Sequence, residues 1–250
     1  LAAMLARREW LETPREQLAA LPGINVEAAR KALNQDDFAH ALAAYGVILP
    51  STWPASTAEE AVQAAEKIGY PVVLKLDSPD FSHKSDVGGV ALNLMDAAAV
   101  QAAYKNIVGA ARDASPGATI QGVLVQKMLS GGQELIVGVR RDPQFGPLAL
   151  VGSGGVEVEL LRDVATGIAP LSEAQASRLL DNTRAGVRLK GWRGTPPADR
   201  PATIEAMRRV AQIACDFSEI DELEINPLYV LPDGGGAYAV DVRGKKIRQD

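Results

Sequence analysis

The sequence predicts an α/β (α+β) fold with mixed sheets, preceded by a short helical segment. Strand-like apolar runs alternate with helical patterns from about residue 36 onward. No fixed repeat period appears, which argues against a solenoid. Hydrophobic residues make up 47% of the 250 residues, and a chain of this length and composition can bury a large core in one domain or in two smaller ones.

The first half of the chain predicts helices and strands in alternation. Residues 1–35 are rich in Ala, Leu, Arg and Glu but are interrupted at Pro14, Pro22 and Gly23, which predicts short helices or a linker. Thr57 can cap a helix and Glu60 follows three residues later. The expected helices are 36–45, 57–68 and 97–112, and the expected strands are 47–49, 70–76 and 90–94.

The second half predicts strands joined by Gly-rich turns. Strands at 123–128 and 135–139 flank Ser130-Gly131-Gly132 and look like a hairpin. Strands at 147–151 and 156–160 flank a second Gly-rich turn. The remaining expected elements are helices at 172–183 and 203–217 and a final strand pair at 223–231 and 237–242.

Composition and charge argue against several classes of function. The net charge of −5 disfavours non-specific nucleic-acid binding, which needs a basic face. No apolar run reaches the roughly 18 residues of a membrane helix, and no signal-peptide pattern opens the chain. The single cysteine, Cys215, lies in an apolar helical stretch and is expected to be a buried hydrophobe, which favours a cytoplasmic location. Because the chain starts at Leu1, we expect either a processed product or a piece of a longer polypeptide.

Lys75 and the loop that follows it have the character of a phosphate site. A lysine in the buried strand 70–76 is costly unless its ammonium meets an anion, although an edge lysine can also reach solvent. The loop ends in Gly88-Gly89, and such a turn lets backbone N–H groups approach a phosphate. The Walker A spacing is absent. His83 in the same loop can accept a phosphoryl group or act as a base, or it can be a hydrogen-bonding loop residue.

A second group of polar residues predicts a site for a divalent metal. Glu222, Glu224 and Asn226 share one face of a predicted strand, and Asp241 lies on the strand that returns beside it. Carboxylate and amide oxygens so grouped suit Mg²⁺, which takes its other ligands from water and phosphates. A solvated acidic strand face is the alternative. The run Gly152-Ser153-Gly154-Gly155 permits close approach to a ligand but is equally compatible with a plain tight turn.

Five stretches, in order, resemble the ATP-grasp domain of the nucleoside-diphosphate-forming acyl-CoA (acetyl-CoA) synthetases, in the succinyl-CoA synthetase superfamily. They are YPVVLKLDSPDFSHKSDVGGV, QELIVGVRRDPQFGPL, GSGGVEVELLRDV, LKGWRGTPPAD and ELEINPLYV. The resemblance covers about residues 36–246. It implies an ATP-grasp domain, assigned to residues 36–250, in which two α/β subdomains, about 36–125 and 126–250, grip the nucleotide. Residues 1–35 are left as the helical linker or N-terminal segment that their composition predicts.

The resemblance also implies which residues bind the nucleotide, ATP or ADP. Lys75 is expected to contact the α- and β-phosphates, and Gly88-Gly89 to cover the phosphates. The stretch Val125-Gln126-Lys127-Met128 is expected to offer hinge backbone groups to adenine. Glu134 is expected near the nucleotide.

The residues implied for phosphoryl transfer form a second set. Asn226 and Asp241 are expected to bind Mg²⁺, with Glu224 beside them as a catalytic residue. His83 is expected to be the catalytic histidine that relays phosphate, and Gly154-Gly155 to face the arriving acyl phosphate or phosphohistidine. These parts suit phosphoryl transfer because that reaction depends on positioning and charge neutralisation.

The implied reaction is acyl-CoA + ADP + phosphate ⇌ acid + CoA + ATP. CoA-binding and phosphohistidine domains are expected in the same polypeptide or on a partner subunit, so this chain should bind nucleotide without completing the reaction. One alternative is the synthetase-like regulatory part of a protein lysine acetyltransferase. A weaker one is a carboxylate–amine ligase, against which the histidine in the phosphate loop argues.

Overall fold

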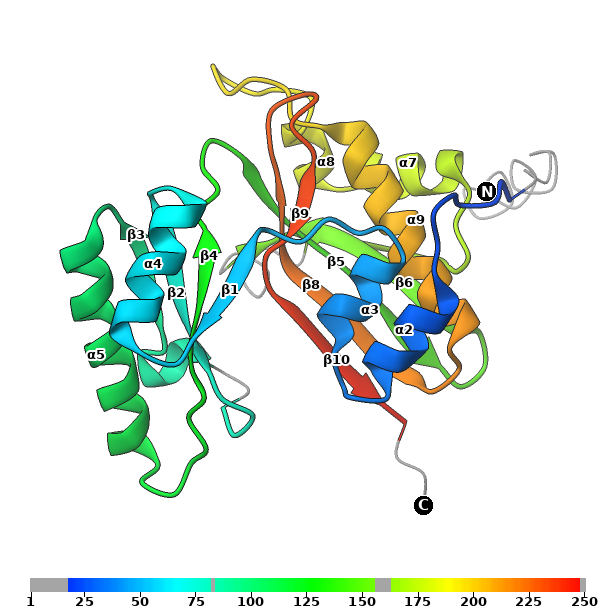
Figure 1. Ribbon diagram of the computed structural model, residues 1–250. Helices are drawn as coiled ribbons and strands as arrows, with labels where there is room; N and C mark the ends of the chain where they lie inside the picture. The colour runs from blue at the N-terminus through cyan, green and yellow to red at the C-terminus, as the bar shows by residue number, and fades with distance from the viewer. Residues whose placement is uncertain (1–17, 82–83, 156–162, 248–250) are drawn as a thin grey trace, which may run out of the picture. The chain divides into compact units, whose positions relative to one another are not determined.

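The computed structural model describes residues 18–81, 84–155 and 163–247, which form two compact units (Figure 1). Unit 2 is Pro50–Ser130, and unit 1 consists of the described residues of Leu1–Leu49 and Gly131–Asp250. The chain therefore begins unit 1, builds the whole of unit 2 and returns to finish unit 1. This division differs from the expected one, because residues 36–49 belong with the C-terminal half and 126–130 with unit 2.

Unit 2 is a sheet with two helices. Its described elements are β1 (Thr52–Ala55), α4 (Ala58–Ile68), β2 (Val72–Asp77), the 3₁₀ turn η1 (Lys84–Val87), β3 (Val90–Leu94), α5 (Ala97–Ala114) and β4 (Gly122–Lys127). The strands pair antiparallel in the order β1-β4-β2-β3. Helices α4 and α5 contact each other and the sheet, and they share one hydrophobic core with it.

Local signals in unit 2 explain its elements. The Thr57 side chain accepts the Glu60 N–H at 3.1 Å, so α4 begins where the capping pattern predicts. In β2 the side chains of Val72, Leu74 and Leu76 are fully buried, as expected for a strand that lies between β3 and β4.

Unit 1 is a larger sheet covered by helices. Its described elements are α2 (Val26–Leu33), α3 (Phe38–Ala44), β5 (Gln133–Asp142), β6 (Gly146–Ser153), β7 (Val164–Ile168), α7 (Glu173–Asp181), α8 (Arg184–Arg188), α9 (Arg200–Asp216), β8 (Ile220–Val230), β9 (Ala237–Ala239) and β10 (Val242–Lys246). The strand order is β10-β8-β5-β6-β7, and β9 pairs with β8 beyond the end of β10. All these pairs are antiparallel.

The helices before unit 2 are built into the core of unit 1. Helix α9 packs against β5, β6 and β8. The Tyr45 ring meets the Phe217 ring edge-on with centroids 6.1 Å apart, and its hydroxyl donates to Asp216 Oδ2 at 2.6 Å. The Arg30 guanidinium lies over the same Phe217 ring at 5.0 Å. The described part of residues 1–35 is therefore not a separate linker, since α2 and α3 are anchored on α9.

Two sequence expectations fail because strand pairing depends on distant partners, and strand β1 was missed. The hairpin expected around Ser130-Gly131-Gly132 is wrong, because β4 pairs within unit 2 whereas β5 pairs with β6 and β8 in unit 1. The strand expected at 47–49 is a single bridge from Ile48 to Tyr238. Strand β1 was not expected, because its sequence TWPA contains a proline that only an edge strand tolerates. The strand expected at 156–160 lies outside the described residues.

Candidate functional site

The polar face of β8 carries the central residues of the site. Leu223 and Ile225 are buried, whereas Glu222 is exposed and Glu224 and Asn226 are half-buried. This alternation follows from the two-residue period of a strand, which puts the three polar side chains on one face. The face predicted from the sequence is therefore present.

Asp241 lies directly beside Asn226. The Asn226 N–H donates to the Asp241 carbonyl oxygen at 3.0 Å, at the gap between β9 and β10. The Asp241 carboxylate also faces the Arg243 guanidinium at 3.4 Å. Asp241 was expected within a strand at 237–242, but it lies in the connection between β9 and β10, and this connection brings it beside Asn226.

The Glu224 carboxyl interacts electrostatically with the polar residues around Asn226. Burial raises the pKa of the Glu224 carboxyl, and the negative charges of Glu222 and Asp241 raise it further. The Arg243 charge and a hydrogen bond with Asn226 oppose this shift without cancelling it. The carboxyl therefore holds a proton more readily than an ordinary surface glutamate.

The turn at Gly154-Gly155 touches this group. The Gly155 N–H donates to Asn226 Oδ1 at 3.0 Å, and the Gly154 N–H donates to the Glu134 carbonyl at 3.1 Å. A Cβ at Gly155 would lie 2.4 Å from Glu134 Oε2, and one at Gly154 would lie 2.4 Å from the Leu135 carbonyl carbon. Only glycine lets the backbone come this close to β5.

Lys75 and the glycine pair lie together in unit 2. Lys75 is half-buried in β2, where it pairs with Val90 of β3 and Leu124 of β4. Gly88 has φ 66°, and a Cβ at Gly89 would lie 2.7 Å from the Lys84 carbonyl oxygen. The Gly89 carbonyl also accepts the Leu76 N–H at 2.7 Å. The turn that needs these glycines is thus hydrogen-bonded to β2 one residue after Lys75.

The expected hinge residues are tied into unit 2 by their own hydrogen bonds. Gln126 is buried, and its Nε2 donates to Thr52 Oγ1 at 3.1 Å. Lys127 Nζ donates to the Gly69 carbonyl at 2.7 Å, where α4 ends. The backbone N–H groups of Lys127 and Met128 donate to the carbonyls of Ser51 and Pro71 at 3.0 and 3.2 Å. Adenine contacts from these two residues would therefore have to use their carbonyl oxygens.

The expected site residues fall into two sets. Unit 1 brings together Glu134, Gly154, Gly155, Glu224, Asn226 and Asp241. Unit 2 holds Lys75, Gly88, Gly89, Gln126, Lys127 and Met128. His83 lies outside the described residues, so its role stays a prediction from the sequence.

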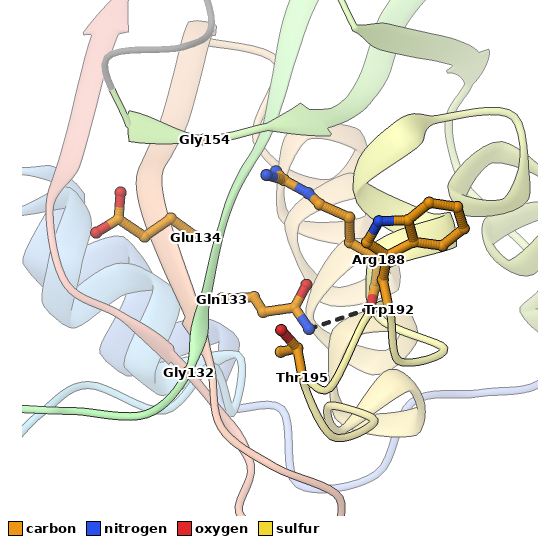
Figure 2. A pocket seen from close by; sticks show the side chains of 7 residues that line it. All are labelled: Gly132, Gln133, Glu134, Gly154, Arg188, Trp192 and Thr195. Atoms are coloured by element: carbon orange, nitrogen blue, oxygen red, sulfur yellow. Dashed lines mark hydrogen bonds between the residues drawn. The ribbon is translucent and has the colours of Figure 1, made fainter.

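A pocket of about 380 Å³ opens in unit 1 and is lined by Glu134 and Gly154, which were expected site residues, and by other residues that sequence reasoning missed. Figure 2 shows the side chains of Gln133, Arg188, Trp192 and Thr195 around it. The sequence signals for these walls are two stretches of the family resemblance, QELIVGVRRDPQFGPL, which begins at Gln133, and LKGWRGTPPAD, which follows Arg188 directly. Neither carries recognisable chemistry for a pocket by itself. Local pattern cannot show that LKGWRGTPPAD returns to the start of β5, where Gln133 lies.

Comparison with known proteins decides the family. A family profile described as an ATP-grasp domain matches residues 25–245. The β subunit of ADP-forming acetate–CoA ligase I from Pyrococcus furiosus is 38% identical over 217 residues, which cover 87% of this chain and 93% of that subunit. The chain belongs to the ATP-grasp family of the ADP-forming acyl-CoA ligases. The expected fold and family are confirmed.

Two further relatives differ in how much of their length the chain matches. The ADP-forming 4-hydroxybutyrate–CoA ligase of Nitrosopumilus maritimus is 38% identical over 254 residues, and the chain spans about a third of its length: 97% of this chain against 36% of that protein. Acetyl-coenzyme A synthetase 1 of Ca. Korarchaeum cryptofilum, solved with coenzyme A and Ca-AMPCP, has 38% identity and a TM-score of 0.82 over 89% of this chain and 99% of that one. A second structure of that protein holds Mg-AMPPCP, with its phosphohistidine segment pointing towards the nucleotide-binding site.

Two further observations bear on the functional classes. None of these relatives is a protein acetyltransferase or a carboxylate–amine ligase, so they give no support to either alternative. Within the described residues, no helix is both long and apolar enough to span a bilayer.

Proposed function

We propose that this chain is the nucleotide-binding and phosphoryl-transfer part of an ADP-forming acyl-CoA ligase. The complete protein would convert acyl-CoA, ADP and phosphate into acid, CoA and ATP through a phosphohistidine. The observation that carries the proposal is the hydrogen bond from the Gly155 N–H to Asn226 Oδ1. It joins a turn that only glycines can form to oxygen atoms suited to a hard cation, and phosphoryl transfer needs both in one place.

Asn226 and Asp241 would hold Mg²⁺. Asn226 offers a hard oxygen atom from β8, and Asp241 offers its carboxylate from the connection between β9 and β10. In the described ranges no three His, Cys, Asp or Glu side chains are grouped to enclose a metal, so a cation here would keep several positions for water and phosphate. That pattern fits Mg²⁺, which is usually bound by one or two protein groups plus substrate phosphates. Once bound, Mg²⁺ would neutralise charge on the phosphates of ATP or ADP.

Glu224 would act beside this metal site. Its ionised carboxyl accepts hydrogen bonds, and its protonated form can also donate one. Because the pKa is raised, the change between these two forms occurs closer to neutral pH than in an ordinary glutamate. Glu134 would contact the nucleotide from the Gly155 side of the turn, where its carboxylate lies.

Unit 2 would hold the rest of the nucleotide. The Lys75 ammonium would neutralise the α- and β-phosphates, and the Gly88-Gly89 turn would cover them. Gln126, Lys127 and Met128 would line adenine through backbone carbonyls, because the N–H groups of Lys127 and Met128 are engaged within the unit.

His83 would relay the phosphoryl group, and Gly154-Gly155 would receive the segment that brings it. CoA-binding and phosphohistidine domains, fused or on a partner subunit, would supply the acyl chemistry. We propose a cytoplasmic location, since the only cysteine, Cys215, is a half-buried free thiol whose pKa burial raises. We propose no nucleic-acid or membrane partner.

Calorimetric titration of the chain with ADP and ATP, with and without Mg²⁺, tests the nucleotide site. We expect binding that strengthens with Mg²⁺ and weakens at least about tenfold in Lys75→Ala, because a buried phosphate contact is lost. Lys105→Ala is the matched control, since Lys105 is an exposed lysine on α5 of the same unit. Equal losses in both variants would contradict a specific role for Lys75.

Turnover of the complete protein tests the reaction. We expect ATP formation from ADP, phosphate and an acyl-CoA, and its loss in His83→Ala with nucleotide binding unchanged. Normal turnover in His83→Ala would make that histidine structural. Nucleotide binding without any turnover would instead favour the regulatory alternative.

A further inference from the structure

The Asp163 side chain links separate segments of unit 1. Asp163 lies just before β7, and its Oδ1 accepts the Arg184 N–H at 2.8 Å. Its Oδ2 accepts the Ala185 N–H at 3.0 Å and the Ser153 hydroxyl at 2.8 Å. Arg184 and Ala185 begin α8, whereas Ser153 ends β6. One carboxylate therefore ties the start of a helix to the end of a strand.

The charge of Asp163 suits this role. Burial raises the pKa of the carboxyl, but the hydrogen bonds from Arg184, Ser153 and Ala185 outweigh burial, and the pKa lies below its ordinary value. The group is therefore ionised at neutral pH and accepts hydrogen bonds at both oxygen atoms. Bonds to an ionised acceptor are stronger than bonds between neutral groups. An asparagine at this position would keep only one accepting oxygen.

The Asp163 backbone holds the end of β6 as well. Its carbonyl oxygen accepts the Ser153 N–H at 3.1 Å, so Ser153 is bound to Asp163 through both backbone and side chain. A Cβ at Gly152 would clash with the same carbonyl oxygen, which shows how closely the two segments approach. Ser153 is 1% exposed, so these bonds are shielded from solvent. The last residue of β6 is therefore fixed in place.

The glycine turn of the candidate site begins at the next residue. The Gly154 N–H donates to the Glu134 carbonyl at 3.1 Å. The Gly155 N–H donates to Asn226 Oδ1 at 3.0 Å, and Asn226 is a proposed Mg²⁺ ligand. The orientation of a metal ligand depends on the groups that hydrogen-bond to it. A shift of Ser153 would therefore be passed through the turn to the Asn226 amide.

We propose that Asp163 is a positioning residue for the Mg²⁺ site. Through Ser153 it holds the glycine turn in the place from which the Gly155 N–H orients Asn226. The inference rests on the proposed function. In this role Asp163 acts through the turn, and not by contact with the nucleotide or the metal. Its loss should therefore weaken the effect of Mg²⁺ on nucleotide binding more than nucleotide binding itself.

Calorimetric titration of the chain with ADP, with and without Mg²⁺, tests this role. In Asp163→Asn we expect the gain in ADP affinity that Mg²⁺ provides to fall about tenfold, the lower end of the cost of losing a group that supports a metal ligand. The dissociation constant without Mg²⁺ should stay unchanged. A general loss of folded protein would instead weaken binding under both conditions, so the ratio of the two constants separates positioning from stability.

Two further variants sharpen the test. Ser153→Ala removes the hydroxyl but leaves the Asp163 bonds to α8, and it should lower the Mg²⁺ gain in the same direction. Asp199→Asn is the matched control. The buried Asp199 carboxylate also joins a helix start to a glycine turn, because it accepts the Ala202 N–H at 3.0 Å and the Gly236 N–H at 2.9 Å. This variant should lower the thermal midpoint and leave the Mg²⁺ gain unchanged.

The outcomes distinguish this assignment from the proposed function. An unchanged Mg²⁺ gain in either Asp163→Asn or Ser153→Ala would overturn the assignment, as would an equal loss in Asp199→Asn. A wild type whose ADP binding does not respond to Mg²⁺ would contradict the proposed function instead. Hydrogen exchange of the Gly155 amide, measured by NMR without ligand, then decides whether Asp163 holds the turn. Faster exchange in Asp163→Asn than in the wild type and Asp199→Asn supports this anchoring, and equal rates overturn it.

Discussion

Asn226 is held by its neighbours at two points. Its N–H donates to the Asp241 carbonyl, and its side-chain oxygen accepts the Gly155 N–H. Both bonds fix the amide before any cation arrives, so little side-chain entropy remains to be lost on binding. The remaining lone pair of that oxygen and the Asp241 carboxylate are the groups on which the metal assignment depends.

Asn226→Ala and Asp241→Ala are expected to remove the advantage that Mg²⁺ gives to nucleotide binding. We expect the affinity for Mg-ADP to fall roughly tenfold or more, as for other disrupted metal sites, with little change in the absence of Mg²⁺. Calorimetry with and without Mg²⁺ measures both values. Glu222→Gln, on the exposed part of the same strand face, is the control. Unchanged Mg²⁺ dependence in both alanine variants would remove the metal assignment.

Glu224→Gln is expected to make the protein more stable at neutral pH. Burial, followed by the Glu222 charge, raises the pKa of Glu224 in the folded state. A carboxyl of this kind contributes stability below its unfolded-state pKa and loses it as pH rises through the folded-state value. The thermal midpoint of the variant should therefore exceed that of the wild type at about pH 7, and the difference should shrink near pH 4. A constant difference across this range would contradict the shifted pKa.

At the scale of elements, two helical glycines show that packing, rather than local helix propensity, determines whether a side chain can be added. Gly186 lies within α8, where a Cβ would lie 1.8 Å from the Leu180 carbonyl oxygen. Gly109 lies within α5 and has open space around the same position. Nothing in the local sequence distinguishes these two helical glycines.

The two glycines are expected to respond oppositely to alanine. Gly186→Ala should destabilise unit 1 by about 1–3 kcal/mol, because a buried backbone contact must open. Gly109→Ala should stabilise unit 2 by up to about 1 kcal/mol through helix propensity alone. Chemical denaturation of both variants measures the difference. Equal effects would mean that α8 does not pack on Leu180 as described.

At the scale of the whole molecule, unit 2 is one continuous segment inserted into unit 1. The chain enters through β1 and leaves through β4, which are neighbours: Thr52 pairs with Gln126. Adjacent ends let such a segment be inserted or excised with little disturbance to its own sheet. Unit 1, by contrast, requires residues from both sides of the insertion.

The fragment Pro50–Ser130 is therefore expected to fold by itself. It contains a complete core and all four strands of its sheet. We expect a helical circular-dichroism spectrum and a cooperative thermal transition. Leu74→Ala, at a fully buried position, should destabilise the fragment by about 2–5 kcal/mol and weaken or abolish that transition. A wild-type fragment without a cooperative transition would show that unit 2 needs unit 1.

Local patterns were enough to predict most elements and to single out the candidate residues, whose roles stay predictions. The cap at Thr57, the alternation along β8 and the buried run of β2 depend on neighbours a few residues away, so their signals are in the sequence itself. The glycines at 154 and 155 also stand out in the sequence, but their pattern fitted a plain tight turn equally well, and the structure shows the close approach of Gly154 to β5. The family followed because five such stretches occur in order.

Only the tertiary structure decided which strands pair and what lines the pocket. The local pattern of β4 and β5 resembles that of a hairpin, yet the two strands belong to different units. The pattern misleads because strand pairing depends on partners far away in the chain. Arg188 and Trp192 have no functional signature of their own. They line the pocket because α8 and the turn after it are brought back beside β5 and Gly154, and that return is determined by the packing of the whole unit.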